Sequence, residues 1–283
     1  MAGYLRESVL KTVVAEMSDL DLDVIVHERI DSTNDWSLQQ CKAGRGLPFV
    51  CFAEEQISGK GRRGKHWLMT ARSNIAMSLV WAFDLSQQSL SLLPLSVALA
   101  IVKTLEALNL TGVQIKWPND VYVHGKKIAG ILIETQPIKK KSSSGGYLSA
   151  VVIGVGLNYD MSSLSSRVID GSPESLPDIT DIKSEINLQD VEKIIDREVV
   201  ASMLLRNVIS TCENFQQDSK QNLEKFRVRY DYCKNRSIDI VLDNQAIVSG
   251  VAQGVNKNAE LIVMIDGENC TFNSAEVSVK VDQ

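Results

Sequence analysis

The sequence predicts an α+β fold in which a large domain of helices and strands precedes a small β-barrel. Between residues 22 and 233, strand-like apolar runs alternate with segments that have the period of about 3.6 residues typical of helices. From about residue 234 onward the apolar residues alternate with a period of two, as in short half-buried strands. With 283 residues, 44% of them hydrophobic, the chain can bury one large and one small core. We therefore expect domains at 1–233 and 234–283.

The first part of the chain predicts helices and strands in alternation. The first helix has an apolar face in which Leu5, Val9, Val13 and Met17 recur every four positions, with Leu10 and Val14 beside them. The cluster DSTN at 31–34 consists of residues that cap helix N-termini, and it predicts a second helix that ends near residue 42. Strands are expected at 24–30, 49–56 and 74–83, which are rich in Val, Ile and Phe.

The remaining elements follow from the same patterns. A helix is expected at 89–108, where Pro94 is tolerated only near the first turn. Strands are expected at 113–117, 127–135 and 147–159, with the tract KKKSSSGG as a mobile hairpin connection between the last two. Residues 188–232 have a helical pattern with one apolar face: Leu204, Leu205, Val208 and Ile209. In the final segment, DN at 243–244 and DG at 266–267 predict hairpin turns.

Composition and charge exclude several classes of protein. Thirty Lys and Arg against 35 Asp and Glu give a net charge of −5, so any anion site must be local. The five cysteines are never spaced as CxxC and only three histidines occur, which argues against a zinc site or a disulfide framework and fits a reducing cytosol. Neither a signal peptide nor an apolar run of about 20 residues is found. We expect a soluble, cytoplasmic protein that does not enter a membrane.

The stretch GKGRRGK at 59–65 is the most informative segment. It places four cations among three glycines, so backbone N–H groups can approach an anion closely while arginines add bidentate bonds. A solvated basic loop or a nonspecific nucleic-acid patch would have the same composition. The segment is not a P-loop, because the pattern GxxxxGK[ST] is absent.

Three further stretches could carry chemistry. KWPND at 116–120 ends a strand with a lysine and a polar turn, although Asn and Asp in such a turn often bond only their own backbone. KKIAGILIE at 126–134 takes two lysines into an apolar strand, where a lysine either reaches water or faces an anionic ligand. IGVGLN at 153–158 closes a buried strand with glycines that allow a flat ligand to approach, and alone it is a weak signal.

Taken together, in this order and spacing, these stretches and DSTN at 31–34 resemble the biotin protein ligases, over roughly residues 22–280. The resemblance implies a central mixed or antiparallel sheet with flanking helices, as in class II synthetases, and a C-terminal SH3-like barrel. Two departures stand out. Lys60 and Lys65 replace arginines of the family loop, which keeps the charge but loses the bidentate fork. The sequence before residue 22 is also too short for the winged helix-turn-helix of bifunctional members, so we expect no specific DNA binding.

The resemblance implies that biotin and ATP are the substrates, with Mg²⁺ on the phosphates, and that biotinyl-5′-AMP forms before biotin passes to a lysine of a biotin carboxyl carrier domain. The implied biotin-binding residues are Ser32, Thr33, Asn34, Gln56, Lys60, Gly61, Arg62, Lys127 and Gly130. The implied ATP- and adenylate-binding residues are Arg63, Lys65, Trp67, Lys116, Asn119, Asp120, Gly156 and Asn158. Lys116 and Arg62 are the implied catalytic residues, and Asp120 is the implied metal ligand. A homodimer through the open edge of the sheet is also expected.

Within these roles, Ser32, Thr33 and Gln56 would bind the ureido ring of biotin, and Lys127 its carboxylate. Lys116 would face the α-phosphate, Asn158 would read the adenylate edge, and Trp67 either covers the adenine or packs in the core. Two alternatives remain. A lipoate ligase of related fold would need an apolar tunnel in place of the polar ureido set, and a nucleic-acid-binding module would use the basic loop alone. The general base of the transfer step has no candidate.

Overall fold

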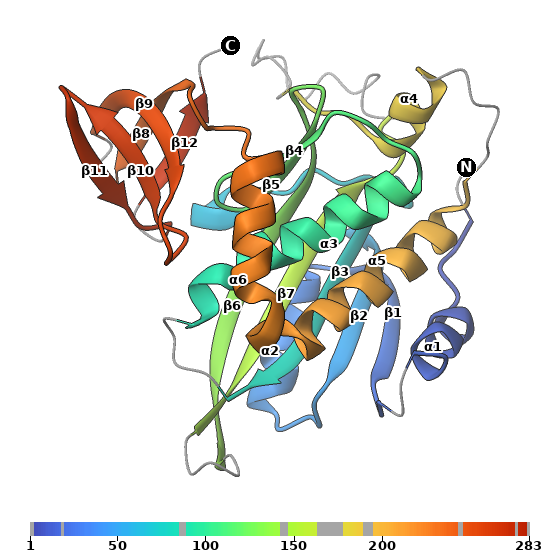
Figure 1. The fold of residues 1–283 in the computed structure, drawn as a ribbon. Coiled ribbons are helices and arrows are strands. Elements are labelled where there is room, and N and C mark those ends of the chain that lie inside the picture. Colours follow the sequence, from blue (N-terminus) through green and yellow to red (C-terminus); the bar gives the residue numbers. More distant parts are fainter. Residues whose placement is uncertain are drawn as a thin grey trace.

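Two β-sheets organise the chain, and helices cover the larger sheet (Figure 1). The structure is a computed structural model that describes residues 3–17, 20–84, 89–141, 147–162, 178–188, 195–242, 246–274 and 277–281. In these residues the larger sheet has seven strands and the smaller, C-terminal sheet has five. The predicted α+β fold with a small C-terminal β-unit is therefore confirmed.

The larger sheet is mixed and has the strand order β1-β2-β3-β7-β6-β5-β4. Only β1 and β2 pair in parallel, and the other neighbours are antiparallel. The strands are β1 (Asp23–Ile30), β2 (Phe49–Gln56), β3 (Asn74–Phe83), β4 (Val113–Lys116), β5 (Asp120–Val123), β6 (Lys126–Lys141) and β7 (Tyr147–Asn158). The sequence does not predict β5, because four residues are too few to show a period. The predicted tract KKKSSSGG joins β6 to β7, and its residues 142–146 lie outside the described part of the chain.

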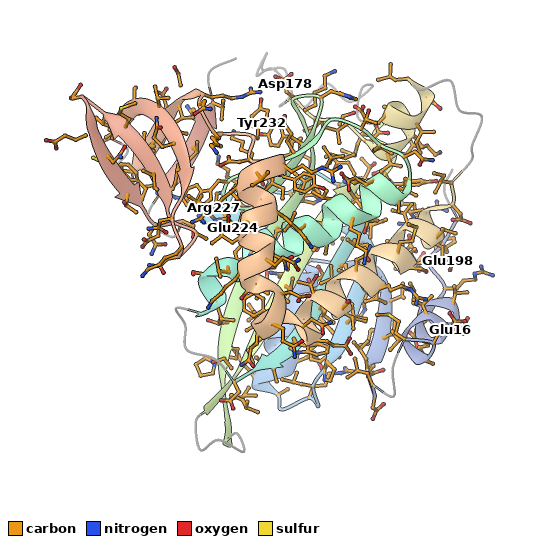
Figure 2. All side chains as sticks on the ribbon, viewed as in Figure 1. Glu16, Asp178, Glu198, Glu224, Arg227 and Tyr232 are labelled. Atoms are coloured by element: carbon orange, nitrogen blue, oxygen red, sulfur yellow. The ribbon has the colours of Figure 1, made fainter. Side chains whose placement is uncertain are left out.

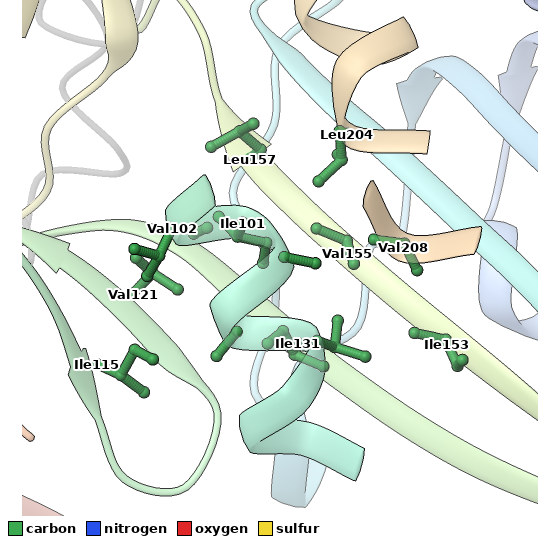
Figure 3. Close-up of a cluster of buried hydrophobic side chains, with 14 of the residues drawn as sticks. Ile101, Val102, Ile115, Val121, Ile131, Ile153, Val155, Leu157, Leu204 and Val208 are labelled. Carbon is green, nitrogen blue, oxygen red and sulfur yellow. The ribbon is translucent and has the colours of Figure 1, made fainter. Parts of the chain in front are cut away.

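Different helices pack on the two faces of this sheet. Helices α3 (Leu93–Ala107) and α5 (Arg197–Glu213) cover one face, with α1 (Glu7–Ala15) and α6 (Phe215–Lys225) beside them (Figure 1). Alternate residues of β7 serve the two faces, since side chains along a strand point to opposite sides. Ile153 and Val155 lie in the large core with Leu204 (Figure 3). Val152 instead lies in a smaller cluster with Cys41 of α2 (Thr33–Lys42).

Helix α3 corrects the expectation that no segment could span a membrane. Among the described residues, the helix at Leu90–Ala107 is long enough and apolar enough to span a membrane, by length and composition alone. Its hydrophobicity has a packing explanation, because Ile101, Val102 and Leu105 are fully or almost fully buried in the core. The helix opens with a 3₁₀ turn at Ser89–Leu92, and Pro94 lies in the first α-helical turn as predicted.

The segment predicted as helical at 188–232 is more broken than its pattern suggests. The short helix α4 (Ile182–Asn187) precedes it, and α5 and α6 are followed by a π-helical turn at Phe226–Tyr230. The predicted apolar face of α5 is confirmed, since its four residues are fully buried. The predicted apolar face of α1 is confirmed, since Leu10 and Val14 are buried and Val9 and Val13 are half-buried.

The C-terminal sheet is antiparallel and packs against the first. Its order is β11-β10-β9-β8-β12, with β8 (Ser237–Leu242), β9 (Ile247–Val255), β10 (Leu261–Ile265), β11 (Glu268–Phe272) and β12 (Val277–Val281). The predicted turn at 266–267 joins β10 to β11 with positive φ at both residues, and residues 243–245, which include the other predicted turn, lie outside the described residues.

Two side chains of the preceding part of the chain bond main-chain carbonyls of the C-terminal segment. Trp117 donates through Nε1 to the Ala259 carbonyl at 2.8 Å, and Arg227 (Figure 2) donates to the Val255 carbonyl at 3.0 Å. The domain division at 233/234 stays a prediction.

A buried ion pair attaches the N-terminal segment to the large domain. Arg197, at the start of α5, is 0% exposed and pairs with Glu54 of β2, which is 3% exposed. Glu54 also accepts a bond from the Leu5 N–H at 2.6 Å, and Arg197 donates to the Gly3 carbonyl at 3.0 Å. Each charge thus has partners, as buried charges require.

Replacing Arg197 should therefore be costly. In Arg197→Leu the Glu54 carboxylate stays buried without its partner, and the free energy of unfolding should fall by about 3–5 kcal/mol. Urea denaturation followed by circular dichroism measures this. Arg206→Ala is the matched control, because Arg206, also on α5, pairs with Glu16 (Figure 2) while both side chains are exposed, and it should change the midpoint little. Equal midpoints for the two variants would contradict this account of the ion pair.

Candidate functional site

One pocket brings together all the residues that the sequence singles out. It has a volume of about 400 Å³ and lies between the N-terminus of α2, the basic loop at 59–67, the β4–β5 turn and the ends of β6 and β7. The predicted residues in its lining are Ser32, Thr33, Asn34, Gln56, Lys60, Gly61, Arg62, Arg63, Lys65, Trp67, Lys116, Asn119, Asp120, Lys127, Gly130, Gly156 and Asn158. Segments more than a hundred residues apart thus form a single cavity.

At one end of the pocket the N-terminus of α2 fixes the orientation of Gln56. Thr33 donates to Gln56 Oε1 through its main-chain N–H at 2.8 Å and through its hydroxyl at 3.1 Å. The oxygen of the amide therefore faces the helix and Nε2 faces away from it. In the described part of the chain, Nε2 has only the sulfur of Met69 as a partner, at 3.9 Å. Gln56 thus offers N–H donors to a ligand.

Ser32 lies beside this group as the N-cap of α2. Its hydroxyl oxygen accepts from the Asp35 N–H at the long distance of 3.5 Å, and its residue is 2% exposed. Because the oxygen acts as acceptor in the cap, the hydroxyl hydrogen is left to donate elsewhere. Ser32 and Gln56 together suit a ligand carbonyl.

Asn34 lines the pocket, and its side-chain amide is bonded within the protein. Its Oδ1 accepts from the Ser78 hydroxyl at 2.6 Å, and its Nδ2 donates to the Glu134 carboxylate at 2.9 Å. A side chain at Gly154 would place its Cβ 2.2 Å from Asn34 Oδ1, so only glycine fits beneath it. The amide is held by the protein at both ends. Asn34 therefore anchors α2 to the sheet. Glu134 and Gly154 belong to stretches that the sequence singled out, whereas Ser78 is a residue that the sequence did not indicate.

Trp67 lies on a flat floor made by two glycines. Gly130 of β6 and Gly156 of β7 are register partners, and a Cβ at either would lie 3.0 or 2.4 Å from the indole. Lys127 Nζ lies 5.5 Å from the ring centroid, within the range of a cation–π contact. The indole Nε1 is buried without a hydrogen-bond partner among the described residues. Trp67 thus packs in the pocket, and its N–H remains for a ligand acceptor.

The basic loop is closed on itself and attached at three points. Gly61 and Trp67 donate main-chain bonds to Lys65 and Gly59, at 2.7 and 2.8 Å, which makes a small hairpin. Lys60 pairs with Asp35 at 2.7 Å, and this hydrogen bond raises the pKa of the Lys60 ammonium. The cations of the loop therefore do not converge on one point, contrary to the picture of a loop wrapped around an anion.

The two arginines of the loop point to the C-terminal sheet. Arg62 donates to Asn119 Oδ1 at 3.1 Å and to the Ser274 carbonyl, while Arg63 donates to the Val241 carbonyl at 3.3 Å. Burial lowers the pKa of the Arg62 guanidinium. Arg63 also has φ 57°, a left-handed conformation that costs a non-glycine residue of order 1–3 kcal/mol.

Two lysines and one carboxylate lie at the centre of the pocket. Lys127 Nζ lies 2.7 Å from Asp120 Oδ1, which links β6 to β5. Lys116 lies over the Tyr122 ring, 5.5 Å from its centroid. Burial lowers the pKa of the Lys116 ammonium, and the neighbouring cations Lys127 and Lys65 lower it further. A group of cations held close together in this way indicates a site for an anion.

The described residues hold no cluster of three or more His, Cys, Asp or Glu that could bind a metal alone. Asp120 is the acidic residue in the pocket lining, and Lys127 already pairs with one of its oxygens. Mg²⁺ is commonly bound by one or two carboxylates together with substrate phosphates and water. The donor set therefore fits a metal that arrives with a nucleotide rather than a resident ion.

Asn158 lines the pocket and is likewise bonded within the protein. Its side-chain amide bonds Asn74 and the Thr180 carbonyl, at 2.8 and 2.9 Å, and so faces the protein. The lining further includes Ile179, Val279 and Lys280, which no motif indicates. Lys280 lies in β12, and only the packing of the second sheet brings it to the pocket. A local pattern in the sequence carries no signal for such a residue.

Comparison with known proteins places this geometry in context. Residues 26–158 match the model of the Biotin/lipoate A/B protein ligase family. The chain is 30% identical over 264 residues to the Biotin--[acetyl-CoA-carboxylase] ligase of Mycobacterium tuberculosis, covering 90% of this chain and 88% of the relative. It is 28% identical to the Bifunctional ligase/repressor BirA of Escherichia coli, covering 89% of this chain and 72% of that protein. The biotin protein ligase of Aquifex aeolicus in complex with biotin and ATP has a similar fold, with TM-score 0.69, 20% identity and coverage of 92% and 99%.

The glycine floor gives a prediction about Trp67. In Gly156→Ala the new methyl group would overlap the indole at 2.4 Å, so the ring must leave the floor. The fluorescence of the indole should shift to longer wavelength as it becomes more hydrated. Subtracting the spectrum of the Trp67→Phe protein isolates the Trp67 signal from those of the other tryptophans. Gly46→Ala is the control, since a Cβ there meets nothing within 4 Å. An unchanged Trp67 spectrum in Gly156→Ala would show that the indole does not rest on this floor.

Proposed function

Because the chain belongs to the biotin protein ligase family, we propose that it is a biotin–[acetyl-CoA-carboxylase] ligase that joins biotin to a carrier protein in two steps. In the first step the biotin carboxylate attacks the α-phosphate of ATP, which forms biotinyl-5′-AMP and releases pyrophosphate. In the second step the amine of a carrier lysine attacks the acyl carbon, which forms an amide and releases AMP. The observation that carries the proposal is the single pocket in which a polar end, a group of cations and a flat glycine floor adjoin.

The cations address the main electrostatic problem of the first step. A carboxylate and a triphosphate repel one another, and positive charge between them lowers that repulsion. Lys127 would bind the carboxylate, and Lys116 would bind the α-phosphate. The lowered pKa of Lys116 reflects the cost of holding this charge among other cations in a half-buried place, and an anionic ligand would relieve that cost.

The polar end of the pocket suits the ureido group of biotin. The Gln56 Nε2 donors and the Ser32 hydroxyl, which both belong to residues that line the pocket, would donate to the ureido carbonyl oxygen. A buried ureido group left without partners would lose about 1–3 kcal/mol for each missing bond. This polar end favours biotin over lipoate, whose dithiolane ring has no hydrogen-bonding groups of this kind.

The basic loop is placed to close over the adenylate. Arg62 and Arg63 bond neutral carbonyl oxygens of the C-terminal sheet, and an adenylate phosphate is a stronger acceptor for a guanidinium. Exchange of these partners would draw the loop over the pocket and exclude water from the reactive anhydride. Trp67 would then cover the ligand with its free Nε1 as donor. Asp120 would hold Mg²⁺ bound to the nucleotide phosphates, where the ion neutralises charge on the leaving pyrophosphate.

The proposed partner in the second step is the biotin carboxyl carrier domain of a carboxylase. A homodimer through the edge of the large sheet and a cytoplasmic location also remain proposals. The homodimer is supported by β6, whose pairing with β5 ends at Gly130. Beyond that residue, among the described residues, the outer edge of β6 is left for another strand. The cytoplasmic location is supported by cysteines that are all free, with four of them buried.

Exchange of labelled pyrophosphate into ATP tests the substrate. The purified protein should catalyse the exchange with biotin and not with lipoate. Exchange that depends on lipoate would assign the chain to the other branch of the family model. Transfer is tested separately, by labelling a carrier domain and its Lys→Arg variant at the acceptor position.

Lys116 gives a sharper prediction. Lys116→Ala should fold normally but lose about 3–4 kcal/mol of transition-state stabilisation, the scale reported for the loss of one electrostatic donor. Pyrophosphate exchange should accordingly fall by more than a hundredfold. Lys126→Ala is a suitable control, because Lys126 is the exposed neighbour of Lys127 and does not line the pocket. Exchange at the wild-type rate in a folded Lys116→Ala protein would exclude the proposed role.

Arg62 gives a prediction about retention of the intermediate. Arg62→Gly removes the guanidinium and frees the backbone of the loop, so adenylate should still form but escape more readily. Released biotinyl-5′-AMP would label exposed lysines of unrelated proteins. Streptavidin blots of a mixed-protein sample measure this, with Arg45→Gly as a control, since Arg45 lies in a loop and does not line the pocket. Labelling confined to the carrier domain would contradict the role assigned to Arg62.

A further inference from the structure

We propose that Asn74 and Asn158 form a buried clamp that positions Lys127, and that both are positioning residues for biotin activation. The inference rests on the proposed function, because it takes Lys127 as the residue that binds the biotin carboxylate. Neither asparagine would touch biotin with its side chain. Their effect would pass through the main chain on either side of Lys127.

The clamp begins where β7 ends. The pairing of β6 with β7 reaches only as far as Ala129 and Leu157 at this end of the sheet. Lys127, two residues nearer the start of β6, therefore has no partner on β7. The segment 178–180 takes the place of β7 there. Lys127 donates its N–H to the Asp178 carbonyl at 2.8 Å and accepts at its carbonyl from the Thr180 N–H at 2.9 Å. Asp178 (Figure 2) thus lies far from Lys127 in sequence and beside it in space.

Asn158 joins this replacement segment to the sheet. Its Nδ2 donates to the Thr180 carbonyl at 2.9 Å and lies 3.5 Å from the Lys127 carbonyl. Its Oδ1 accepts from Asn74 Nδ2 on β3 at 2.8 Å. Asn74 is 0% and Asn158 2% exposed, so water does not compete for these bonds. One side chain therefore connects β3 to segment 178–180 across the end of β7.

The orientation of both amides is set by their outer partners. The Thr180 carbonyl can only accept, so Asn158 Nδ2 faces it and Asn158 Oδ1 faces Asn74, which must present its Nδ2. The Asn74 carbonyl accepts from Arg197 at 3.0 Å, which ties the clamp to the buried ion pair with Glu54. Turning either amide over would place two oxygens, Asn74 Oδ1 and Asn158 Oδ1 or Asn158 Oδ1 and the Thr180 carbonyl, against each other. The clamp thus has one arrangement in which every buried group is satisfied.

The main-chain position of Lys127 determines where its ammonium group lies, because the side chain contacts two neighbours at once. Its ammonium lies 2.7 Å from Asp120 and 5.5 Å from the Trp67 ring centroid. A reacting carboxylate must be held within a few tenths of an ångström of its productive place for efficient attack. Movement of the Lys127 main chain would shift the ammonium relative to both neighbours. The clamp therefore preorganises the cation rather than supplying charge.

The test compares Asn74→Asp and Asn158→Asp with the wild type. The first substitution would place a carboxylate oxygen against Asn158 Oδ1, and the second would place one against the Thr180 carbonyl. Each variant should lower kcat/KM for biotin in pyrophosphate exchange by about tenfold, the effect of one lost buried hydrogen bond. Hydrogen exchange of the peptides at 126–128 and 178–181 should become faster. Asn207→Asp is the control, because it makes the same substitution at a part-buried, hydrogen-bonded position away from the pocket.

A pH profile separates positioning from simple destabilisation. Once protonated, the carboxyl group that Asn74→Asp introduces can donate to Asn158 Oδ1 as the amide does, so the ratio of variant to wild-type activity should rise as the pH falls. The serine side chain in Asn74→Ser is too short to reach Asn158, so this variant should show the same loss of kcat/KM without recovery at low pH. It replaces Asn74→Asp in the test if the aspartate variant does not fold. Control-like kcat/KM and hydrogen exchange in these variants would overturn the clamp. If the wild type shows no biotin-dependent exchange, the proposed function fails, while hydrogen exchange at 178–181 still decides whether the clamp exists.

Discussion

The antiparallel register of β3, β7 and β6 is the constraint on which the pocket depends. It aligns Ser78 with Gly154, and it aligns Gly156 with Gly130. The first pair lies beneath Asn34 and the second beneath Trp67, so the sheet itself shapes the two halves of the floor. A shift of one residue would exchange the two faces of a strand and place Val155 under the ligand. The large core on the opposite face, with Val155 and Ile153 packed against α3 and α5, holds this register in place.

Most polar groups around the pocket are satisfied by the protein, and the exceptions define where a ligand would bind. The amides of Asn34 and Asn158 are bonded at both ends, and they support the walls. Gln56 Nε2 and Trp67 Nε1 lack good partners among the described residues. Buried donors without acceptors are costly in an empty site and favourable once a ligand supplies the acceptor. The pattern of satisfied and unsatisfied groups thus distinguishes scaffold from binding residues where residue type alone does not.

The sequence predicts the strands of the large sheet well, because Val-, Ile- and Phe-rich runs bounded by polar turns have few alternatives. It also predicts the composition of the pocket, through motifs that are contiguous in the chain. It does not predict β5, which is too short to show periodicity, or the π-helical turn at Phe226–Tyr230, which no residue pattern marks. The hydrogen bonds of Asn34 and Asn158 depend on Ser78 and Asn74, which lie on β3. Such partners become visible only when tertiary contacts are known.

The contact between the basic loop and the second sheet uses main-chain acceptors, since Arg62 and Arg63 bond the carbonyls of Ser274 and Val241. A carbonyl oxygen is present whatever side chain its residue bears. Substitutions at these two positions would therefore leave the contact intact, whereas a change in the length of either connection would move the acceptor out of reach. The second sheet is thereby free to vary in amino-acid composition while the spacing of its loops is held fixed. Its outer surface can change its charge or its affinity for other proteins without disturbing the loop that it supports.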